Sequence, residues 1–328
     1  MIQTTITRTG KIYCDKNRHL EWLYVGDYGK ENNIKADFLG LNKKIDGVKH
    51  TNVDITDKMV VTISTQKGCP MLCDFCDAPK VGFYGNASTI DMLYMINHAL
   101  IDSKAQFAKR LNVHFARIGE PTFNRAVLET AAIIWSLKFN IPEIRDINLT
   151  HNFITETVHP VLSTMLPHDN TDLESYLIDW CLLKNRYYQG EAGLQLSINS
   201  TCEKQRNNSF NHTSLSLDEI SKLCKRLPSP LGRKYTLNFA VTQETILCAE
   251  KLNNLFDKEK FIVKITPIHQ TKNAIQNNYD VSTTYDKYDV YSKFEEPLLE
   301  LGWDVIVFVP SKEEDEDRIT CGNALLSD

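Results

Sequence analysis

The chain has 328 residues, of which 42% are apolar and 24% charged, a composition typical of a soluble globular protein with an ample core. It contains no run of about 18 apolar residues, which excludes a transmembrane helix, and its first residues lack the apolar block of a signal peptide. Nine cysteines, an odd number, favour a reducing compartment, so we expect a cytoplasmic protein with no membrane partner. The net charge of −5 offers no general attraction for nucleic acid, although a local basic patch can outweigh the sum.

Residues 1–58 predict a small β-rich N-terminal extension. Polar and β-branched residues alternate there around turn signals near Thr9, Asp27 and Asp46, which suggests two hairpins. From residue 59 the pattern changes to strand, loop and helix in repetition, which is typical of parallel βα units. We therefore expect one barrel-sized α/β domain over residues 59–310, followed by a C-terminal tail over residues 311–328.

The domain is expected to contain six βα units and an end strand. The predicted strands are at 59–64, 113–118, 144–150, 193–199, 235–242, 261–266 and 303–309. One predicted helix follows the N-cap Ser88, and helical segments are predicted within 153–187, with an interruption at 167–170. The other predicted helices are at 124–138, 217–226, 244–256 and 285–301.

The loop after the first of these strands, residues 64–85, contains Cys69, Cys73 and Cys76 in the spacing C-x3-C-x2-C. Thiolates are soft ligands that suit iron–sulfur clusters, and three of them can hold three irons of a [4Fe–4S] cube. Because no fourth cysteine lies nearby in the sequence, one iron would stay open to bind a substrate or cofactor. The loop follows the C-terminal end of a strand, where α/β folds collect their chemistry.

Two plainer interpretations of these cysteines are a zinc site and three buried structural thiols. Zinc prefers four ligands, and His50 and His114 are too distant in the sequence to complete a local site. The tight spacing on a loop rich in glycine and proline therefore favours the iron–sulfur cluster.

The motif, with Phe75 just before the third cysteine, resembles the signature of radical S-adenosylmethionine (SAM) enzymes, and the flanking S-T-Q-K-G-C and G-F-Y-G-N resemble the RlmN/Cfr-type adenosine methyltransferases that modify ribosomal RNA. The resemblance implies a [4Fe–4S] cluster whose open iron chelates SAM, and reductive cleavage of SAM to a 5′-deoxyadenosyl radical. It also implies an open partial (β/α)6 barrel, and an electron donor such as flavodoxin or ferredoxin.

Gly119, Glu120 and Pro121 follow the second predicted strand. Glycine allows a ligand to approach the backbone closely, and the glutamate could accept hydrogen bonds from the SAM ammonium group. A plain turn is the alternative interpretation. One βα unit after the cysteine loop, the G-E-P sequence resembles the family's motif for the SAM amino group.

The resemblance implies a SAM-binding role for four further residues near strand ends: Thr150, Ser197, Asn199 and His269. Ser197 and Asn199 share one face of their strand, where the family pattern is S-x-H, and both could bind ribose hydroxyls or the SAM carboxylate. Thr150 takes the place of a family hydroxyl residue, and His269 that of an asparagine. A purely structural role for His269 is equally open.

Cys321 lies in the C-terminal sequence D-R-I-T-C-G-N-A-L-L, which resembles the family's A-A-C-G-Q-L. In the family this cysteine is methylated by one SAM; a radical from a second SAM takes hydrogen from the S-methyl group, and the carbon radical adds to an adenine. Gly322 would permit the turn that brings the thiol to the barrel mouth. An inert tail cysteine is the alternative.

Thr62 stands seven residues before Cys69, where the family has a second catalytic cysteine that releases the covalent adduct as a disulfide. A threonine hydroxyl cannot form a disulfide. Either another group resolves the adduct, or the reaction differs from the methylation of adenine. The segment before the first βα unit is also too short to hold the family's helical RNA-binding domain.

Two substrate classes therefore stay open: an adenine of RNA (tRNA or rRNA), and a small molecule, nucleotide or peptide on the same scaffold. A zinc or iron–sulfur binding module without catalytic activity is a third reading. The basic residues that could attract RNA are Lys222, Lys225, Arg226, Arg233 and Lys234, although a solvated helix face is the better explanation of this run.

Overall fold

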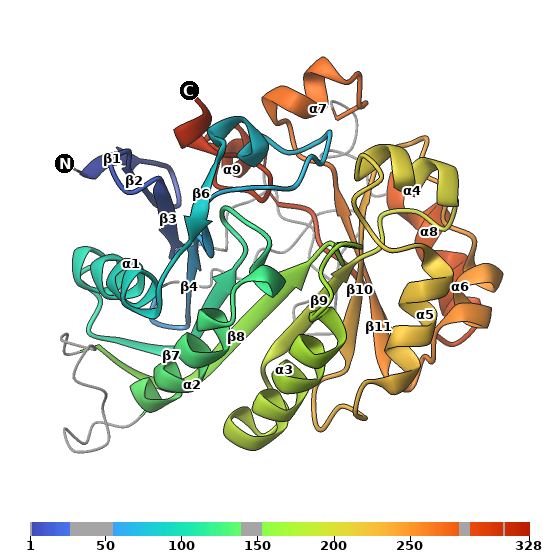
Figure 1. The fold of residues 1–328 in the computed structure, drawn as a ribbon, viewed down its shortest axis with the longest axis horizontal. Helices are drawn as coiled ribbons and strands as arrows, with labels where there is room; N and C mark the ends of the chain where they lie inside the picture. Colours follow the sequence, from blue (N-terminus) through green and yellow to red (C-terminus); the bar gives the residue numbers. More distant parts are fainter. Residues whose placement is uncertain (1, 27–54, 139–152, 282–288, 311) are drawn as a thin grey trace.

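The structure is a computed structural model that describes residues 2–26, 55–138, 153–281, 289–310 and 312–328. Within these residues, ten strands form one sheet in the order β1-β2-β3-β4-β7-β8-β9-β10-β11-β12 (Figure 1). The parallel strands are β4 (Lys58–Ile63), β7 (Phe107–Phe115), β8 (Ile154–Thr164), β9 (Gly193–Ser197), β10 (Tyr235–Val241), β11 (Phe261–Pro267) and β12 (Val305–Val307). The chain is therefore an α/β protein with a mostly parallel central sheet, as the sequence predicts.

Three antiparallel strands extend this sheet beyond β4: β1 (Ile2–Ile6), β2 (Gly10–Asp15) and β3 (Leu20–Val25). The turn signal near Thr9 separates β1 from β2, whereas those near Asp27 and Asp46 lie outside the described residues. Because β3 pairs with β4, the first strands of the chain continue the main sheet. A separate antiparallel pair, β5 (Gln66–Gly68) and β6 (Phe83–Asn86), encloses the cysteine loop.

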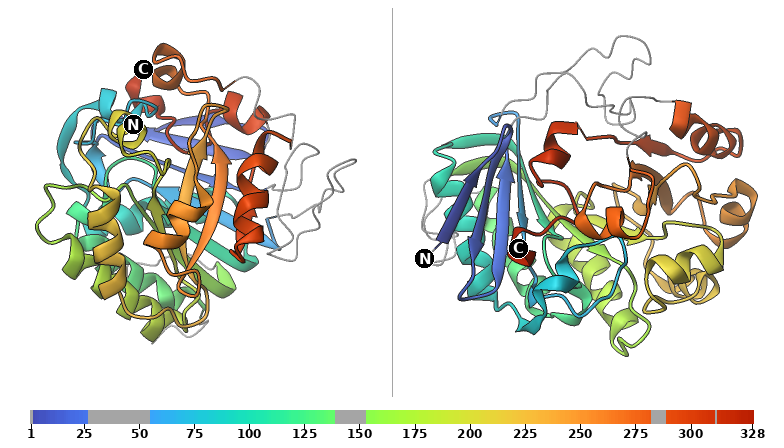
Figure 2. Two further views of the ribbon diagram at one scale, coloured as in Figure 1. Left: turned by 90° about the vertical axis from the view of Figure 1, so that its right-hand side faces the viewer. Right: turned by 90° about the horizontal axis from the view of Figure 1, so that it is seen from above.

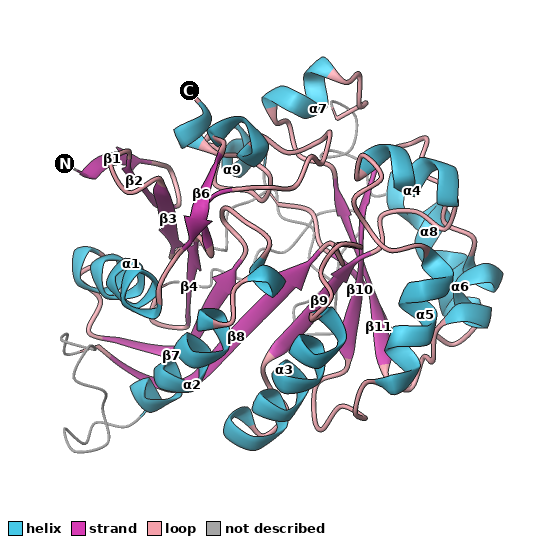
Figure 3. Ribbon diagram, viewed as in Figure 1, coloured by secondary structure: helices cyan, strands magenta, loops and turns pink. Residues whose placement is uncertain are grey.

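The larger helices pack on one side of the parallel strands (Figure 3). The helices of the described residues are α1 (Thr89–Asp102), α2 (Ala126–Ile134), α3 (Leu173–Tyr188), α4 (Glu203–Ser209), α5 (Leu217–Arg226), α6 (Ala249–Leu255), α7 (Lys272–Gln276), α8 (Asp289–Glu300) and α9 (Lys312–Glu316). None of these helices has both the length and the apolar character that are needed to cross a lipid bilayer.

Two helices begin at capping boxes. Ser88 accepts a hydrogen bond from the amide of Asp91, whose carboxylate accepts one from the amide of Ser88 at the start of α1. Ser216 and Glu219 make the same exchange before α5. The N-cap predicted at Ser88 is therefore confirmed, and α5 has the predicted bounds.

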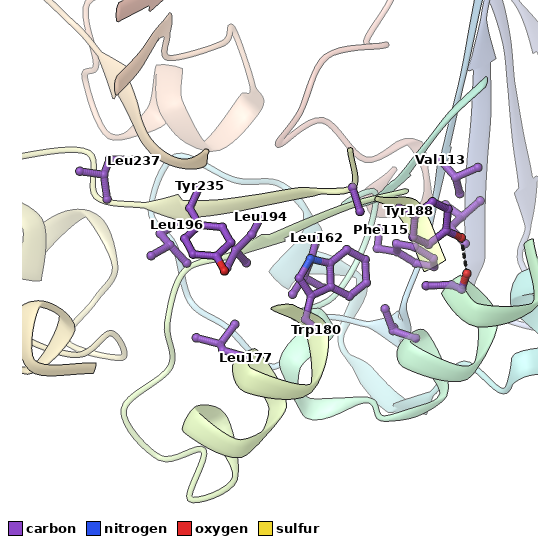
Figure 4. Close-up of a cluster of buried hydrophobic side chains, with 14 of the residues drawn as sticks. Val113, Phe115, Leu162, Leu177, Trp180, Tyr188, Leu194, Leu196, Tyr235 and Leu237 are labelled. Carbon is purple, nitrogen blue, oxygen red and sulfur yellow. Dashed lines mark hydrogen bonds between the residues drawn. The ribbon is translucent and has the colours of Figure 1, made fainter. Parts of the chain in front are cut away.

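The two faces of the parallel sheet differ sharply in polarity. Apolar side chains such as Leu162, Leu194 and Leu237 point towards the helices and form the main core around Trp180 of α3 (Figure 4). Side chains that alternate with these point to the opposite face, which we call the inner face, and many of them are polar. A parallel sheet that is buried on both sides is normally apolar on both, so the polar inner face indicates a site for chemistry or binding.

One predicted segment is wrong. Residues 153–187 were expected to be helical, but β8 occupies residues 154–164 and pairs in parallel with both β7 and β9. Pro160 lies inside this central strand, opposite Val113, although proline cannot donate a ladder hydrogen bond. The helix α3 begins only at Leu173. The strand predicted at 144–150 lies outside the described residues.

Candidate functional site

The cysteine loop is closed by its own hairpin. The amide of Cys69 donates a 2.8 Å hydrogen bond to the carbonyl of Gly82. Gly68 has a φ of +82°, and a Cβ atom at this position would lie 1.9 Å from the carbonyl oxygen of Gly82. Only glycine therefore lets the two strands meet here, and this contact fixes where the first cysteine leaves the hairpin.

Cys69, Cys73 and Cys76 are free and partly buried. Burial raises the pKa of Cys69 to about 11. Burial also raises the pKa of Cys73, and negative charge on Cys76 and Cys69 raises it further. The pKa of Cys76 is raised by burial and then by negative charge on Cys69. The three groups therefore repel one another as thiolates, and a bound cation that accepts their charge would relieve that repulsion.

These residues fit an iron–sulfur cluster in chemistry and in surroundings. Apolar side chains, among them Met71 and Met165, line the loop and limit the access of water. Among the described residues, no group of three or more histidines, cysteines or carboxylates is arranged around a single metal ion. A cube, however, contacts each thiolate through a different iron, and does not require the three sulfurs to meet at one point.

Residues at the start of α7 hold the cysteine loop in place through hydrogen bonds. Thr271 donates to the carbonyl of Phe75 at 2.7 Å, and Asn273 donates to the carbonyl of Cys76 at 2.5 Å. The carboxylate of Asp77 in turn accepts from the amides of Lys272 and Asn273. The Phe75 ring packs edge-on against Phe210 and Tyr279. The loop is thus held by contacts to residues about 200 positions later in the chain.

Glu120 is buried at the end of β7, and both of its carboxylate oxygens accept hydrogen bonds. Oε1 accepts from the amide and hydroxyl of Thr122 at 3.1 and 2.8 Å, and Oε2 accepts from the amide of Met165 at 3.0 Å. Burial raises the pKa of Glu120, and these hydrogen bonds oppose the shift. Gly119 has a φ of +103° and packs on Gln66. The side chain of Gln66 accepts a hydrogen bond from the Glu120 amide. Pro121 begins a short 3₁₀ turn.

The structure brings a hydroxyl residue to Glu120 that sequence reasoning missed. Thr164 ends β8 and hydrogen-bonds the Glu120 carboxylate. The residue expected in this place, Thr150, lies outside the described residues. Thr164 is the threonine of the T-M-L sequence that follows V-L-S at the end of this strand. Its position at a strand end can be recognised only once residues 154–164 are identified as a strand.

Ser197 ends β9, as predicted, whereas Asn199 lies two residues beyond the end of this strand and not on a shared strand face. Asn199 adopts a left-handed backbone with a φ of +59°, and its Oδ1 accepts from the amide of Ala240 at 3.1 Å. The carbonyl of Ser197 accepts from Arg206, a fully buried arginine that also binds the carbonyls of Ile198 and Leu215. Burial lowers the pKa of Arg206 to about 10, while Cys73 opposes this shift. Arg206 is thus a cation beside the cysteine loop, which the sequence did not single out.

His269 faces a buried carboxylate. Its Nδ1 lies 3.5 Å from Oδ1 of Asp315, and burial lowers the pKa of the imidazole. Asp315 also accepts hydrogen bonds from the amide of Gln270 and the hydroxyl of Thr320, both at 2.5 Å. The residues before Cys321 are therefore tied to the segment that follows β11.

The C-terminal tail runs alongside the cysteine loop (Figure 2). The carbonyl of Gly322 accepts a 2.8 Å hydrogen bond from the amide of Asp77, the residue after Cys76. Gly322 has a φ of +89°, and a Cβ atom there would approach Thr271 Cγ2 at 3.2 Å and Cys76 Cα at 4.0 Å. The structure therefore places Cys321 next to Cys76, and negative charge on Cys321 raises the pKa of the Cys76 thiol.

Cys321 is exposed as a residue, whereas protein groups surround its thiol. The desolvation of the thiol by these groups raises its pKa, and the positive charges of Arg117 and Lys264 oppose the shift. A reactive cysteine is expected in such partly exposed, electropositive surroundings. The two cations, neither of which was singled out from the sequence, come from β11 and from the segment after β7.

A buried ion pair anchors the tail. Arg117 and Glu21 of β3 lie 2.5 Å apart, with side chains 1% and 0% exposed. Arg117 donates to the carbonyls of residues 318, 319 and 320, directly before Cys321. Glu21 accepts from the amides of Leu325 and Leu326 on the other side. The pair therefore grips the tail on both sides of the candidate catalytic thiol.

Comparison with known proteins shows similarity to a group of RNA methyltransferases. No protein-family model matches the chain. It is 32% identical over 108 residues to a protein of Chlorobium phaeobacteroides named probable dual-specificity RNA methyltransferase RlmN, a match that covers 31% of this chain and 29% of the relative. The protein of the same name from Mycobacterium marinum is 40% identical over 67 residues, or 20% of this chain and 18% of the relative. The chain thus matches less than a third of the length of these relatives.

The fold is similar to a solved structure over nearly the whole chain. The crystal structure of a radical SAM methyltransferase from Sphaerobacter thermophilus superimposes with a TM-score of 0.65, and covers 99% of this chain and 81% of that protein at 15% identity. This likeness shows the fold. The chain is therefore similar to RlmN methyltransferases in part of its sequence, and it has the fold of a radical SAM methyltransferase.

Proposed function

We propose that the chain is a [4Fe–4S]-dependent radical SAM enzyme, a methyltransferase of the RlmN/Cfr type that acts through a methylated Cys321 on an adenine of RNA. The observation that carries this proposal is the position of the Cys321 thiol next to Cys76 of the C-x3-C-x2-C loop. The fold similarity and the matched segment support the same assignment.

The three loop cysteines would hold the cluster, which supplies the electron that cleaves SAM. Phe75 and Gly119 would contribute to the walls of the SAM site. Because both oxygens of Glu120 already accept hydrogen bonds, this residue would position the ends of β7 and β8 as much as it would bind an ammonium group. Ser197, Asn199 and His269 stay candidates for contacts to the ribose, carboxylate or adenine of SAM, and an open partial (β/α)6 barrel is the scaffold that we propose around them.

Cys321 would accept the methyl group from one SAM. As its thiolate attacks the methyl carbon, a sulfur–carbon bond forms, the bond from that carbon to the sulfonium breaks, and S-adenosylhomocysteine leaves. Arg117 and Lys264 favour the thiolate because they place positive charge beside it. Thr62 lies on the inner face of β4, opposite His114 of β7. Because this residue is a threonine, another group would have to release the covalent adduct between Cys321 and the product.

Mass spectrometry tests the assignment of Cys321. The purified protein, reconstituted anaerobically and treated with SAM, is expected to carry one additional methyl group on the peptide that contains Cys321. The Cys321→Ala variant should lose this mass but still form 5′-deoxyadenosine, whereas Cys73→Ala should lose both the iron and the 5′-deoxyadenosine. Product methylation by Cys321→Ala at the wild-type rate would remove this residue from the mechanism.

A second candidate is a radical SAM enzyme on the same scaffold that modifies a small molecule, nucleotide or peptide. Two of the five basic residues proposed for an RNA surface are neutralised: Arg226 pairs with Glu174 at 2.5 Å, and Lys234 pairs with Asp304 at 2.9 Å. This observation favours a substrate whose binding does not depend on the positive charge of α5 and the segment after it. An electron donor such as flavodoxin or ferredoxin and a cytoplasmic location belong to both proposals.

A further inference from the structure

Positive charge gathers on the inner face of the sheet. Arg233 lies just before β10, next to Lys264 of β11, whereas Arg110 comes from β7, which is separated from β10 by two strands. Arg110 lowers the pKa of Arg233, and Arg233 lowers the pKa of Lys264, which burial brings down to about 8. We call these three residues the inner cationic cluster.

The sheet is curved rather than flat, and the inner cationic cluster lies on its inner face (Figure 2). The pKa of His114 on β7 falls to about 3, first because of burial and then because of Lys264 on β11. Three strands separate β7 from β11 in the sheet, so a flat sheet would hold the two side chains about 19 Å apart. The inner face is therefore concave, and its cations converge on a common space.

Little negative charge balances the cluster. Glu191 is the acidic residue whose charge acts on Arg110 and Arg233, and none of the three cations forms an ion pair with another described residue. Lys264 instead rests over the ring of Phe308 at 5.4 Å. Cations that are desolvated and repel one another reduce stability, and a concave wall of one sign concentrates ligands of the opposite charge.

Two polar groups beside the cluster lack hydrogen-bond partners. Oδ1 of Asn238 and Oγ1 of Thr236 are buried on β10 without a partner, and Asn238 lies directly opposite Lys264 in the strand pairing. Buried polar atoms in folded proteins are almost always satisfied, so such atoms indicate a missing ligand or water. An amide oxygen needs a donor, which a phosphate ester without a free hydroxyl does not supply, whereas a ribose hydroxyl or a base N–H does.

We propose that the inner cationic cluster binds the phosphate group of a nucleotide, and that Asn238 accepts a hydrogen bond from its sugar or base. The charge of Lys264 also acts on Cys321, so a nucleotide held by Lys264 lies beside the thiol that would carry the methyl group. This proposal deepens the proposed function, on which it rests for its link to methylation. The nucleotide is either free or one residue of an RNA chain.

Binding measurements with the full, anaerobically purified chain test this site. The probes are inorganic tripolyphosphate, the four nucleoside 5′-triphosphates and a 12-nucleotide RNA without terminal phosphates, each titrated in phosphate-free buffer by calorimetry. At least one nucleotide or the RNA should bind, and Arg233→Gln and Lys264→Gln should each weaken this binding tenfold or more, because each removes a charge-assisted contact. Lys251→Gln on the exposed side of α6 is the matched control, and should leave binding unchanged.

A second set of variants separates the roles of the contacts. Asn238→Leu should weaken the binding of the nucleotide or RNA at least fivefold but leave tripolyphosphate binding unchanged. Lys264→Gln should not lower the melting temperature of the free protein, because it relieves repulsion; this distinguishes a binding role from a structural one. Free nucleotides that bind identify a small substrate, and binding of the RNA alone identifies its backbone as the source of the phosphate.

The site is overturned if no probe binds, or if binding does not depend on Arg233 and Lys264. Because the measurement requires neither SAM cleavage nor methyl transfer, it fails independently of the proposed function. A protein that binds nucleotide through these residues but never cleaves SAM would retain the phosphate site and lose the radical mechanism.

Discussion

At the scale of single residues, the candidate site depends on positions that tolerate only one kind of side chain. Gly322 is one case, since its φ of +89° disfavours any other residue and a Cβ atom there would crowd Thr271 Cγ2 at 3.2 Å. Glu120 is another, because hydrogen-bond donors surround both of its oxygens. In both cases the local geometry decides where a neighbouring reactive group stands.

The substitution Gly322→Ala should move the tail away from the cysteine loop. The backbone strain costs about 1 kcal/mol, and the added Cβ lies 3.2 Å from Thr271 Cγ2. We expect the alkylation rate of Cys321 by iodoacetamide to change several-fold. Gly85→Ala is the control, because Gly85 has a similarly positive φ of +111° but open space around it. Equal effects of the two variants on Cys321 would contradict the role of the contact.

At the scale of elements, the tail is held in place by a strand that comes some 300 residues earlier. The Glu21–Arg117 pair binds backbone groups on both sides of Cys321, so it acts as a clamp between β3, the end of β7 and the tail. A buried ion pair of this kind contributes more to the positioning of the tail than to global stability, because desolvation offsets much of its Coulomb energy.

Arg117→Met should release the tail. Glu21 would become an unpaired buried charge, which costs on the order of 3–5 kcal/mol, and three backbone carbonyls would lose their donor. Hydrogen exchange should therefore accelerate in residues 318–326, together with a loss of methyl transfer to Cys321. The matched control is Arg125→Met, which removes an exposed arginine that pairs with Asp172 and Asp179. Unchanged protection of the tail in Arg117→Met would rule out the clamp.

Much of the parallel sheet follows from the sequence, and the exceptions have physical causes. Strands such as β10 and β11 read as buried apolar runs because their outer faces pack on helices. The strand β8 was missed, because Pro160 breaks its pattern and its inner-face residues are polar. The cysteine motif and Cys321 stood out by their spacing and resemblance. Arg117, Arg206 and Lys264 did not, because only the folded sheet shows that these cations lie beside the thiols.

At the scale of the whole molecule, the polar inner face makes stability depend on pH. His114 and His159 lie on neighbouring strands, and burial followed by nearby cations lowers the pKa of each to about 3. Both histidines are therefore neutral in the folded protein. In the unfolded chain they take up protons near pH 6.5, so their contribution to stability is present above pH 6.5 and is lost as the pH falls towards 3.

We expect the free energy of unfolding to fall by about 2 kcal/mol between pH 6.5 and pH 5.5 through these two histidines. Chemical denaturation at the two pH values measures the change. His159→Gln should remove about half of it, whereas His212→Gln, at an exposed position, should not alter it. A wild-type pH profile that His159→Gln leaves intact would show that this imidazole is not buried in its neutral form.

The clamp on the tail also sets an order of events during biosynthesis. Glu21, the acidic residue of the clamp, is translated with the first strands, and the cysteine loop follows some 50 residues later. The tail residues that Glu21 binds are translated about 300 positions after it. Contacts this distant in the chain form late in folding. A nascent chain can therefore form the β5–β6 hairpin around the cysteine loop before Cys321 is translated. The Cys321 thiol joins the loop only after the strands of the sheet have been made.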